Sequence, residues 1–550
     1  MFKLQIKQLS SLEKVFLNAE PQGKEISSLQ AVLGGEASYQ IAFSCMQEGE
    51  YLPQDFTWAL ESPLQAWISI YRVGQVPSAL PAYPERVDSQ YLSTQPGLFP
   101  DPLFPVQSNE IEAFPGRWQT LWISIRIPAG IPAGKYPIRF FFTQGDFTVG
   151  TATMQLDILP ITLEKQTLIY TQWLHVDCIA DIHTVPIYSE AHWRLIEQYI
   201  RMAAEHGVNM LLTPVLTPPL DTKIGGQRPT TQLVDIHIIN GSYQFGWDKL
   251  ARFVRTAQSC GIQYFEISHL FTQWGAHAAP KVMAKVKGKQ TQLFGWDTPA
   301  QSPAYAEFLQ SFLPALVSFF TKMGLQDKIF FHVSDEPSAE DIPSYRAAAE
   351  MVAGLLKGYP IIDALSDIAY WKDGLVKNPV VSTDHIQPFL EETTVDNLWC
   401  YYCGGQCQHV SNRFFAMPSK RTRILGVQLY TGNIRGFLHW GYNFYYTRLS
   451  KHIIDPYHIT DAGESFPSGD AFSVYPYRDT VIPSIRLKVF YEALQDLQLL
   501  RQLEHAIGRP AVESLLQDTA GQPITFQYCP DSPDFYLHLR EMMISHLLKT

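Results

Sequence analysis

The segment KIFFHVSDEP, residues 328–337, contains the unit from which this fold is built. Its apolar first half predicts a buried strand, which runs directly into two adjacent acids, Asp335 and Glu336, before Pro337 ends it. The next four residues, SAED, are typical of a helix start, and an amphipathic stretch then runs to a glycine that suits a helix end. A buried strand followed by such a helix is the βα unit of a parallel sheet.

The same unit recurs along the chain from about Leu168 onward. Helical stretches such as EAHWRLIEQYIRMAAEHG (190–207) separate most of the apolar strand candidates. Eight candidates in series, with a long helix after the last, predict a TIM-type (β/α)8 barrel over residues 166–505, in which the helices after the fifth and sixth strands are short. The strand candidates are LIYTQWLH (168–175), VNMLLTPV (208–215), IQYFEISHL (262–270), KIFFHVSD (328–335), PIIDALS (360–366), VVSTDHI (380–386), NLWCYYC (397–403) and GFLHWGY (436–442).

The first 165 residues have a different pattern. Short alternating runs such as YQIAFSC (39–45), LWISIRIP (121–128) and YPIRFFF (136–142) are separated by glycine, proline, asparagine and aspartate. This pattern predicts an N-terminal antiparallel β-sandwich. We therefore expect a multidomain protein: a sandwich over 1–165, a barrel over 166–505, and a C-terminal tail, 506–550, with a helix packed on the barrel.

Charge and composition restrict the partners. The chain has 42 Lys and Arg against 53 Asp and Glu, and no basic run, so a nucleic-acid partner is not expected. No apolar run reaches the length of a membrane span, and the N-terminus lacks the apolar core of a signal peptide. Seven cysteines do not form a disulfide framework. We expect a cytoplasmic protein with a neutral oligosaccharide or glycoconjugate substrate, no membrane partner and an oligomeric state that the sequence leaves open.

The chemistry of such a barrel lies at the C-terminal ends of its strands. Carboxylates, imidazoles and aromatic rings gather at the predicted strand ends, and the acid pair after the fourth strand is the sharpest feature. Neighbours on a strand face opposite sides, but this constraint loosens where a strand frays, so both acids can reach the mouth of the barrel. The alternative is that Asp335 caps the loop while Glu336 faces solvent.

Several segments of this chain resemble glycoside hydrolase family 123 and its relatives. The resemblance is carried by HVSDEP, NLWCYYCGG, GFLHWGYNFYY and GDAFSVYP followed by PSIRLKVFYEALQDLQLL, and more weakly by LWISIRIPAGIPAGKYP in the sandwich. It implies a catalytic barrel behind an N-terminal sandwich and the activity of a β-N-acetylgalactosaminidase. It also implies a retaining mechanism without a cofactor, in which the substrate's 2-acetamido group is the nucleophile.

The resemblance implies one role for each acid. Asp335 would hold the acetamide nitrogen, and Glu336 would be the general acid and base. Physical chemistry favours a protonated acid beside a second carboxylate, because two like charges at close range raise each other's pKa.

A second set of residues is expected to bind the sugar. Trp399 and Tyr401 lie two apart on the seventh strand and should both point into the mouth, where the resemblance makes them the wall around the pyranose and its N-acetyl group. For each aromatic the alternative is a core ring with no ligand contact. The candidate substrate-binding residues are His175, His332, Asp384, Trp399, Tyr401, Trp440 and Asn443.

Three other functions remain open from the sequence. A zinc site would use Cys400, Cys403, Cys407 and His409, although their spacing matches no common zinc motif. A metal-dependent barrel hydrolase would take its ligands from the strand ends, that is from His175, Asp177, Asp384, His385 and His439. A barrel with an aromatic mouth could also bind a glycan without cleaving it.

Overall fold

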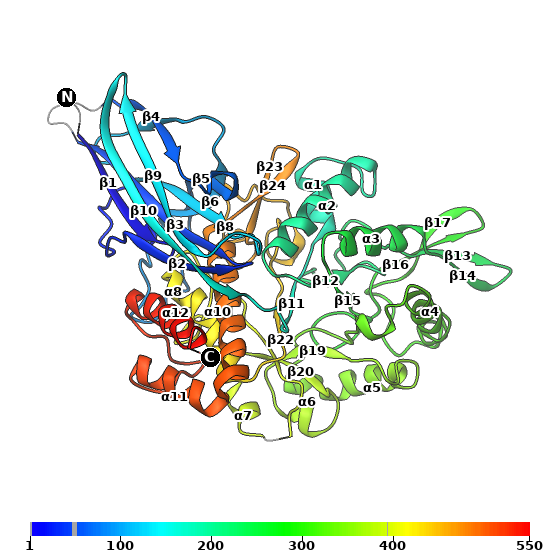
Figure 1. The fold of residues 1–550 in the computed structure, drawn as a ribbon. Coiled ribbons are helices and arrows are strands. Elements are labelled where there is room, and N and C mark those ends of the chain that lie inside the picture. The colour runs from blue at the N-terminus through cyan, green and yellow to red at the C-terminus, as the bar shows by residue number, and fades with distance from the viewer. Residues whose placement is uncertain (1–2, 47–51, 393, 550) are drawn as a thin grey trace.

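The computed structural model describes residues 3–46, 52–392 and 394–549. Its N-terminal part is a sandwich of two five-stranded sheets, as predicted (Figure 1). Neighbouring strands are antiparallel except β2 and β10, which pair in parallel. One sheet has the order β1 (Lys3–Ser10), β3 (Glu36–Met46), β8 (Gln119–Arg126), β5 (Ile68–Ser78), β6 (Gly97–Pro105). The other has the order β2 (Ser28–Leu33), β10 (Phe147–Thr162), β9 (Gly134–Gln144), β4 (Gln54–Glu61), β7 (Glu110–Ala113).

The second part is an eight-stranded parallel barrel, and each predicted strand segment overlaps one of its strands, although the sixth strand begins at Asn378, two residues before the segment predicted for it. The sheet order runs from β18 through β11 and β22 to β19, and a parallel bridge between Phe331 and Ile361 joins its two ends. The predicted (β/α)8 barrel is thereby confirmed. Its strands are β11 (Ile169–Gln172), β12 (Met210–Thr213), β15 (Tyr264–Ile267), β18 (Ile329–Phe330), β19 (Ile362–Leu365), β20 (Asn378–Ser382), β21 (Trp399–Tyr401) and β22 (Gly436–His439).

Helices surround the barrel, and their starts show why they form where they do. Ser189 and Ser302 accept hydrogen bonds from backbone N–H groups in the first turns of α2 and α4, as helix caps do. The helices after β19 and β20 are single turns, as the sequence predicts. The helices up to the last barrel strand are α1 (Val176–Ile182), α2 (Glu190–Glu205), α3 (Asp248–Ser259), α4 (Pro303–Lys322), α5 (Ile342–Ala353), α6 (Ala369–Lys372), α7 (Gln387–Leu390), α8 (Ser419–Arg423) and α9 (Leu425–Thr431).

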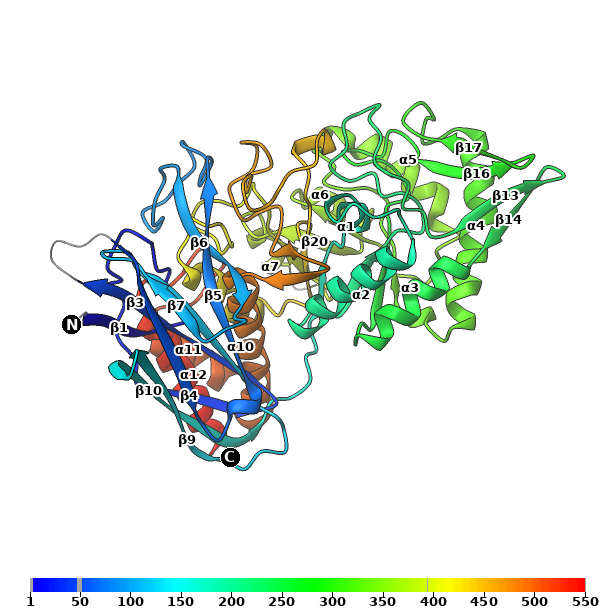
Figure 2. The same cartoon turned by 90° about the horizontal axis from the view of Figure 1, so that it is seen from above.

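Two small sheets were not predicted. A four-stranded sheet extends from the end of the barrel that lies away from the sandwich (Figures 1 and 2). It consists of β13 (Asp235–Ile239), β14 (Ser242–Gly246), β16 (Val282–Val286) and β17 (Lys289–Phe294). A hairpin of β23 (Val474–Tyr477) and β24 (Thr480–Pro483) precedes the long helix. Both sheets are insertions in strand-to-helix connections.

The long helix α10 (Ile485–Ile507) joins the two parts of the molecule. Two further helices follow it in the C-terminal tail, α11 (Arg509–Ala520) and α12 (Pro533–Leu547). Figures 1 and 2 show all three beside the sandwich. Arg486 of α10 pairs with Asp101 at 2.8 Å, and Lys488 pairs with Glu36 at 2.9 Å. All four side chains are buried, and losing one partner of a buried ion pair is strongly destabilising. The sandwich is therefore fixed on the barrel through α10.

Side chains pack the inside of the barrel. Trp399 is buried there, and Gly436 on the next strand makes room for it, because a Cβ at Gly436 would lie 2.0 Å from the indole ring.

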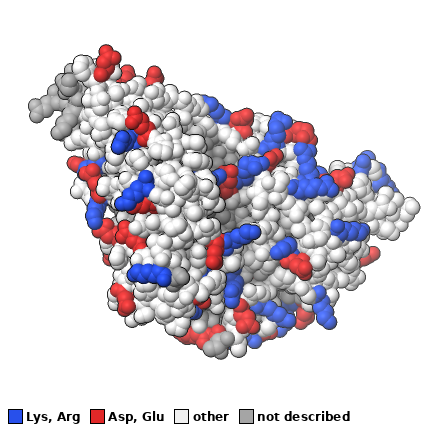
Figure 3. Space-filling model, in the orientation of Figure 1, with Lys and Arg blue, Asp and Glu red and all other residues white. Residues whose placement is uncertain are grey.

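On the face shown in Figure 3, positive and negative side chains are interspersed rather than gathered in a basic stripe. Within the described ranges no helix combines the length and the apolar character that crossing a bilayer requires.

Candidate active site

A cavity of about 300 Å³ opens at the C-terminal ends of the barrel strands. Its position follows from the fold, because the loops after parallel strands all meet at this face. Its wall combines carboxylates with aromatic rings, which suits a sugar. The lining residues used below are Tyr83, Trp173, Asp221, Trp274, Asp335, Glu336, Tyr401, Cys403, Gly404, Trp440, Arg448, Phe466 and Asp470.

The backbone at Glu336 allows two neighbouring acids to face one cavity. Strand β18 ends at Phe330, so Asp335 and Glu336 lie in the loop beyond it. Glu336 has a φ of +41°, a left-handed conformation that costs a residue with a side chain about 1–2 kcal/mol. The Trp274 N–H donates a 2.8 Å hydrogen bond to the Asp335 carbonyl and holds this loop. Such strain at a cavity wall is typical of a functional site.

The environment raises the pKa of both acids. For Asp335, burial raises the pKa well above its ordinary value, and the neighbouring Glu336 raises it further, while His332 opposes them. Glu336 is exposed at the mouth of the cavity; the protein atoms around its carboxyl group raise its pKa by desolvation, and hydrogen bonds from Tyr401 and Cys403 oppose this. The Tyr401 hydroxyl donates to Glu336 Oε1 at 2.6 Å. The pair therefore retains a proton at a pH where isolated carboxyl groups have lost theirs.

A buried charge network lies below Asp335. His332 bonds through Nε2 to Glu266 Oε1 at 2.6 Å and through Nδ1 to Asp363 Oδ1 at 3.0 Å. Burial alone would lower the pKa of His332, but these two hydrogen bonds outweigh it and raise the pKa to about 9. His332 is thus an imidazolium between two carboxylates. His269 stacks on it with ring centroids 4.1 Å apart, and burial keeps the pKa of His269 well below 6.5.

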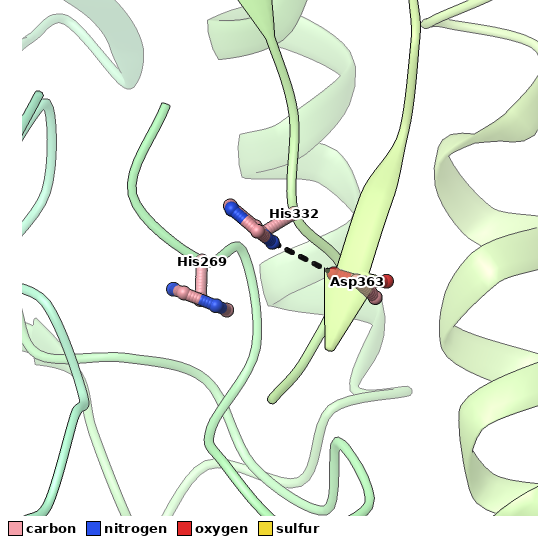
Figure 4. Close-up of side chains that lie close together, drawn as sticks. All are labelled: His269, His332 and Asp363. Atoms are coloured by element: carbon pink, nitrogen blue, oxygen red, sulfur yellow. Dashed lines mark hydrogen bonds and ion pairs between the residues drawn. The ribbon is translucent and has the colours of Figure 1, made fainter. Parts of the chain in front are cut away.

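The nearest approach to a metal-ligand set is part of this network. His269, His332 and Asp363 have donor atoms within 4.8 Å of one another, and Figure 4 shows their arrangement. Both nitrogens of His332 already bond carboxylates, and the two imidazole rings lie nearly parallel, so the geometry fits a hydrogen-bonded network rather than a coordination sphere. Among the described residues, this is the only such group, and it contains none of the proposed zinc ligands or strand-end metal ligands.

Residues 173–503 match the model of the glycoside hydrolase 123 catalytic domain, which is more than half of the chain. The chain belongs to glycoside hydrolase family 123. The chain shares its fold with a family 123 glycoside hydrolase from Clostridium perfringens, whose structural analysis addressed the hydrolysis of glycolipid glycans. The TM-score is 0.74 at 14% identity, over 100% of this chain and 98% of that one. A GH5 xyloglucanase from Bacteroides ovatus is far less similar, with a TM-score of 0.31 at 8% identity, over 85% of this chain and 98% of that one. Among curated proteins, none matches the chain significantly.

The structure of this family 123 glycosidase brings four predicted site residues to the cavity wall: Asp335, Glu336, Tyr401 and Trp440. Three others, His332, Trp399 and Asp384, are not on it. His332 and Trp399 are fully buried below it. The Asp384 carboxylate accepts a hydrogen bond from Gln406 Nε2 at 3.0 Å, and its charge helps to raise the pKa of Glu336.

His175 and Asn443 also lie behind the wall and contact each other. The His175 N–H donates to Asn443 Oδ1 at 2.9 Å, and Asn443 Nδ2 donates to the His175 carbonyl at 3.0 Å. His175 Nε2 is 2.9 Å from the Trp440 carbonyl, and Arg228 bonds both His175 and Asp177. His175 and Asn443 thus contact the backbone at Trp440 and are not among the residues that line the cavity.

Several wall residues had not been singled out from the sequence. Trp173 precedes His175 by two positions, so strand parity could have indicated it. Asp470 lies in the GDAFSVYP segment, where only the resemblance drew attention to it. Trp274 and Asp221 come from irregular loops with no local signal, and Arg448 starts a short 3-10 turn that has none either.

The sandwich also contributes a side chain to the cavity. Tyr83, in the loop between β5 and β6, lines the wall and donates to the Ser465 carbonyl at 3.1 Å. Arg86 of the same loop donates to the Gly405 carbonyl at 2.5 Å. This loop thus packs on the two barrel loops that carry Cys403 and Asp470. No pattern within one segment could reveal a contact across more than 300 residues.

Proposed function

We propose that this family 123 glycosidase removes a terminal β-linked N-acetylhexosamine of galacto configuration from a glycan, with retention of configuration. One observation carries the proposal: Asp335 and Glu336, adjacent in sequence, face a single cavity lined with aromatic rings. The galacto configuration rests on the family resemblance alone. The Clostridium perfringens relative is described as hydrolysing glycolipid glycans, which supports a glycoconjugate as the substrate.

In the first step the 2-acetamido carbonyl oxygen attacks the anomeric carbon, and the bond to the leaving oxygen breaks. Glu336 donates its proton to that oxygen, while Asp335 accepts a hydrogen bond from the acetamide N–H and balances the charge of the oxazolinium ion that forms. In the second step water attacks the anomeric carbon from the face opposite the acetamido oxygen, which is the face that the leaving group has vacated. Glu336 takes a proton from this water, the ring of the oxazolinium opens, and the sugar leaves with its original configuration.

The protonation states support these roles. In the free protein desolvation raises the pKa of both acids, which favours the retention of a proton by the pair. When substrate binds, the acetamide N–H stabilises the ionised form of Asp335, and His332 below it acts in the same direction. The proton then resides on Glu336, where the leaving oxygen needs it. Tyr401 keeps the Glu336 carboxyl in a fixed position through its hydrogen bond.

The test is hydrolysis of nitrophenyl β-N-acetylgalactosaminide and its gluco epimer. We expect turnover by the wild type, a loss of at least about 100-fold in Glu336→Gln and Asp335→Asn, and no change in Glu340→Gln, whose exposed side chain lies four residues further on. A nitrophenyl galactoside without the acetamido group should not turn over. If it does so equally well, substrate assistance is wrong. If the wild type binds N-acetylhexosamine but releases no nitrophenol, the protein is a glycan-binding module.

A further inference from the structure

A third carboxylate, Asp470, lies on the cavity wall without belonging to the acid pair. It is 1% exposed, and burial raises its pKa to about 7 against the effects of Arg413, of the Trp440 hydrogen bond and of the Gly404 N–H. A buried carboxylate is unfavourable unless its oxygens are satisfied. Packing alone therefore does not explain why a carboxylate lies at this position on the cavity wall.

Protein donors hold one side of this carboxylate. Oδ2 accepts a 3.1 Å hydrogen bond from Trp440 Nε1, and the Gly404 N–H also favours the ionised form. Oδ1 has no hydrogen-bond partner among the described residues, because the nearest nitrogen, His439 Nε2, is 3.6 Å away. His439 Nδ1 accepts from the Gly441 N–H and Arg413 Nη2, so the neutral ring carries its proton on Nε2, on the side of Asp470.

Arg413 supplies a positive charge behind this arrangement. Its guanidinium is buried, and in the part of the chain that the structure describes it has no carboxylate within 4 Å. It bonds instead the backbone carbonyls of Gly441 and Asp470 and the ring of His439. Trp440 and Gly404 on the wall and Arg413 behind it thus position the carboxylate and balance its charge, while Oδ1 has no hydrogen-bond partner among the described residues. An ionised carboxylate accepts about four hydrogen bonds, and these donors use two at most.

We propose that Asp470 accepts a hydrogen bond from one hydroxyl group of the sugar in the cavity, at C3, C4 or C6, and thereby determines which sugar the site accepts. This rests on the proposed function, because it presumes a pyranose in contact with the acid pair. Hydroxyl groups are the donors that a neutral sugar offers, and a preorganised acceptor gives up little freedom on binding. The same carboxylate holds the Trp440 indole, so one residue orients both the hydroxyl and the ring that the sugar packs against.

The test combines Asp470→Asn and Asp470→Ala with nitrophenyl N-acetylhexosaminides that lack the hydroxyl at C3, C4 or C6. We expect Asp470→Ala to lose about 10- to 100-fold in kcat/KM on the complete sugar, which is the range for a hydrogen bond to a charged group. On one deoxy sugar, and only on that one, wild type and variant should differ by less than threefold. Asp373→Asn, which removes an exposed carboxylate paired with Arg346, is the control.

If Asp470→Ala loses the same factor on every deoxy sugar, Asp470 supports Trp440 only, and the proposal is overturned. This outcome differs from a failure of the proposed function, in which the wild type itself turns over none of these sugars. Melting temperatures show whether each variant folds. Should the alanine variant unfold, Asp470→Asn keeps the side-chain shape and must show the same selective coupling, with KM raised more than kcat is lowered.

Discussion

The hydroxyl of Tyr401 donates to Glu336 Oε1 at 2.6 Å, which joins the end of β21 to the loop after β18 across the mouth of the barrel. Tyr402, the next residue, is also buried, but its hydroxyl has no hydrogen-bond partner among the described residues. The two tyrosines therefore form a matched pair for testing what the bond does.

Tyr401→Phe is expected to lower kcat roughly tenfold, in line with the loss of one hydrogen bond to a charged group. The hydrogen bond lowers the pKa of Glu336, so its removal raises that pKa. Because the general acid must be protonated, the alkaline limb of the kcat/KM profile should move to higher pH. Tyr402→Phe should leave the profile unchanged. A limb that stays in place in Tyr401→Phe would contradict the assignment of Glu336 as the acid.

The second prediction concerns stability and pH. The folded protein raises the pKa of His332 from 6.5 to about 9, so folding is favoured by protonation of this ring. This contribution, roughly 3 kcal/mol, is complete below pH 6.5 and disappears as pH rises through 9. The urea midpoint of the wild type should therefore fall between pH 6.5 and 9. In His332→Gln the protein should be less stable at pH 6, because two buried carboxylates lose their cation, and this part of the pH dependence should vanish.

The third prediction concerns the sandwich loop. Tyr83→Ala removes a ring from the cavity wall and should raise KM about tenfold with little change in unfolding free energy. Tyr83→Phe keeps the ring and loses only the bond to Ser465, so its KM should stay close to that of the wild type. Tyr136→Ala, which removes a half-buried sandwich tyrosine that does not line the cavity, is the control. Equal KM values in all three variants would mean that Tyr83 does not contact the substrate.

The fourth prediction concerns the barrel interior. Gly436→Ala places a methyl group 2.0 Å from the Trp399 ring, which is locked inside the barrel, and should destabilise the protein by at least about 2 kcal/mol. Gly354→Ala, where a Cβ meets open space, should be neutral or slightly stabilising. Chemical denaturation of the two variants tests this. A Gly436→Ala protein as stable as the wild type would show that Trp399 has room to move.

Elements that repeat a local pattern could be predicted from the sequence. Seven barrel strands lie within the predicted segments and the remaining one, β20, begins two residues before its segment, because each is a short apolar run followed by a helix or a turn. Asp335 and Glu336 could be singled out as candidates for the same reason, since they directly follow such a run. Strand parity alone, however, would have placed Trp399 in the cavity beside Tyr401. Parity gives the side of the strand but not the depth, and Trp399 lies lower in the barrel interior.

Residues that reach the site through long connections could not be predicted in this way. His175 and Asn443 lie at strand ends as expected, yet their polar atoms bond each other and the Trp440 backbone, which depends on how two loops meet. Tyr83 depends on the docking of two parts of the chain. Asp470 depends on a loop that no periodic pattern marks.

Because Tyr83 of the sandwich lines the cavity, loss of activity on heating should follow the unfolding of the sandwich. If the sandwich unfolds at a lower temperature than the barrel, the cavity loses part of its wall, and catalysis should stop at that lower unfolding transition. A more thermostable variant of this enzyme would therefore need a stronger interface between sandwich and barrel before it needs a more stable barrel.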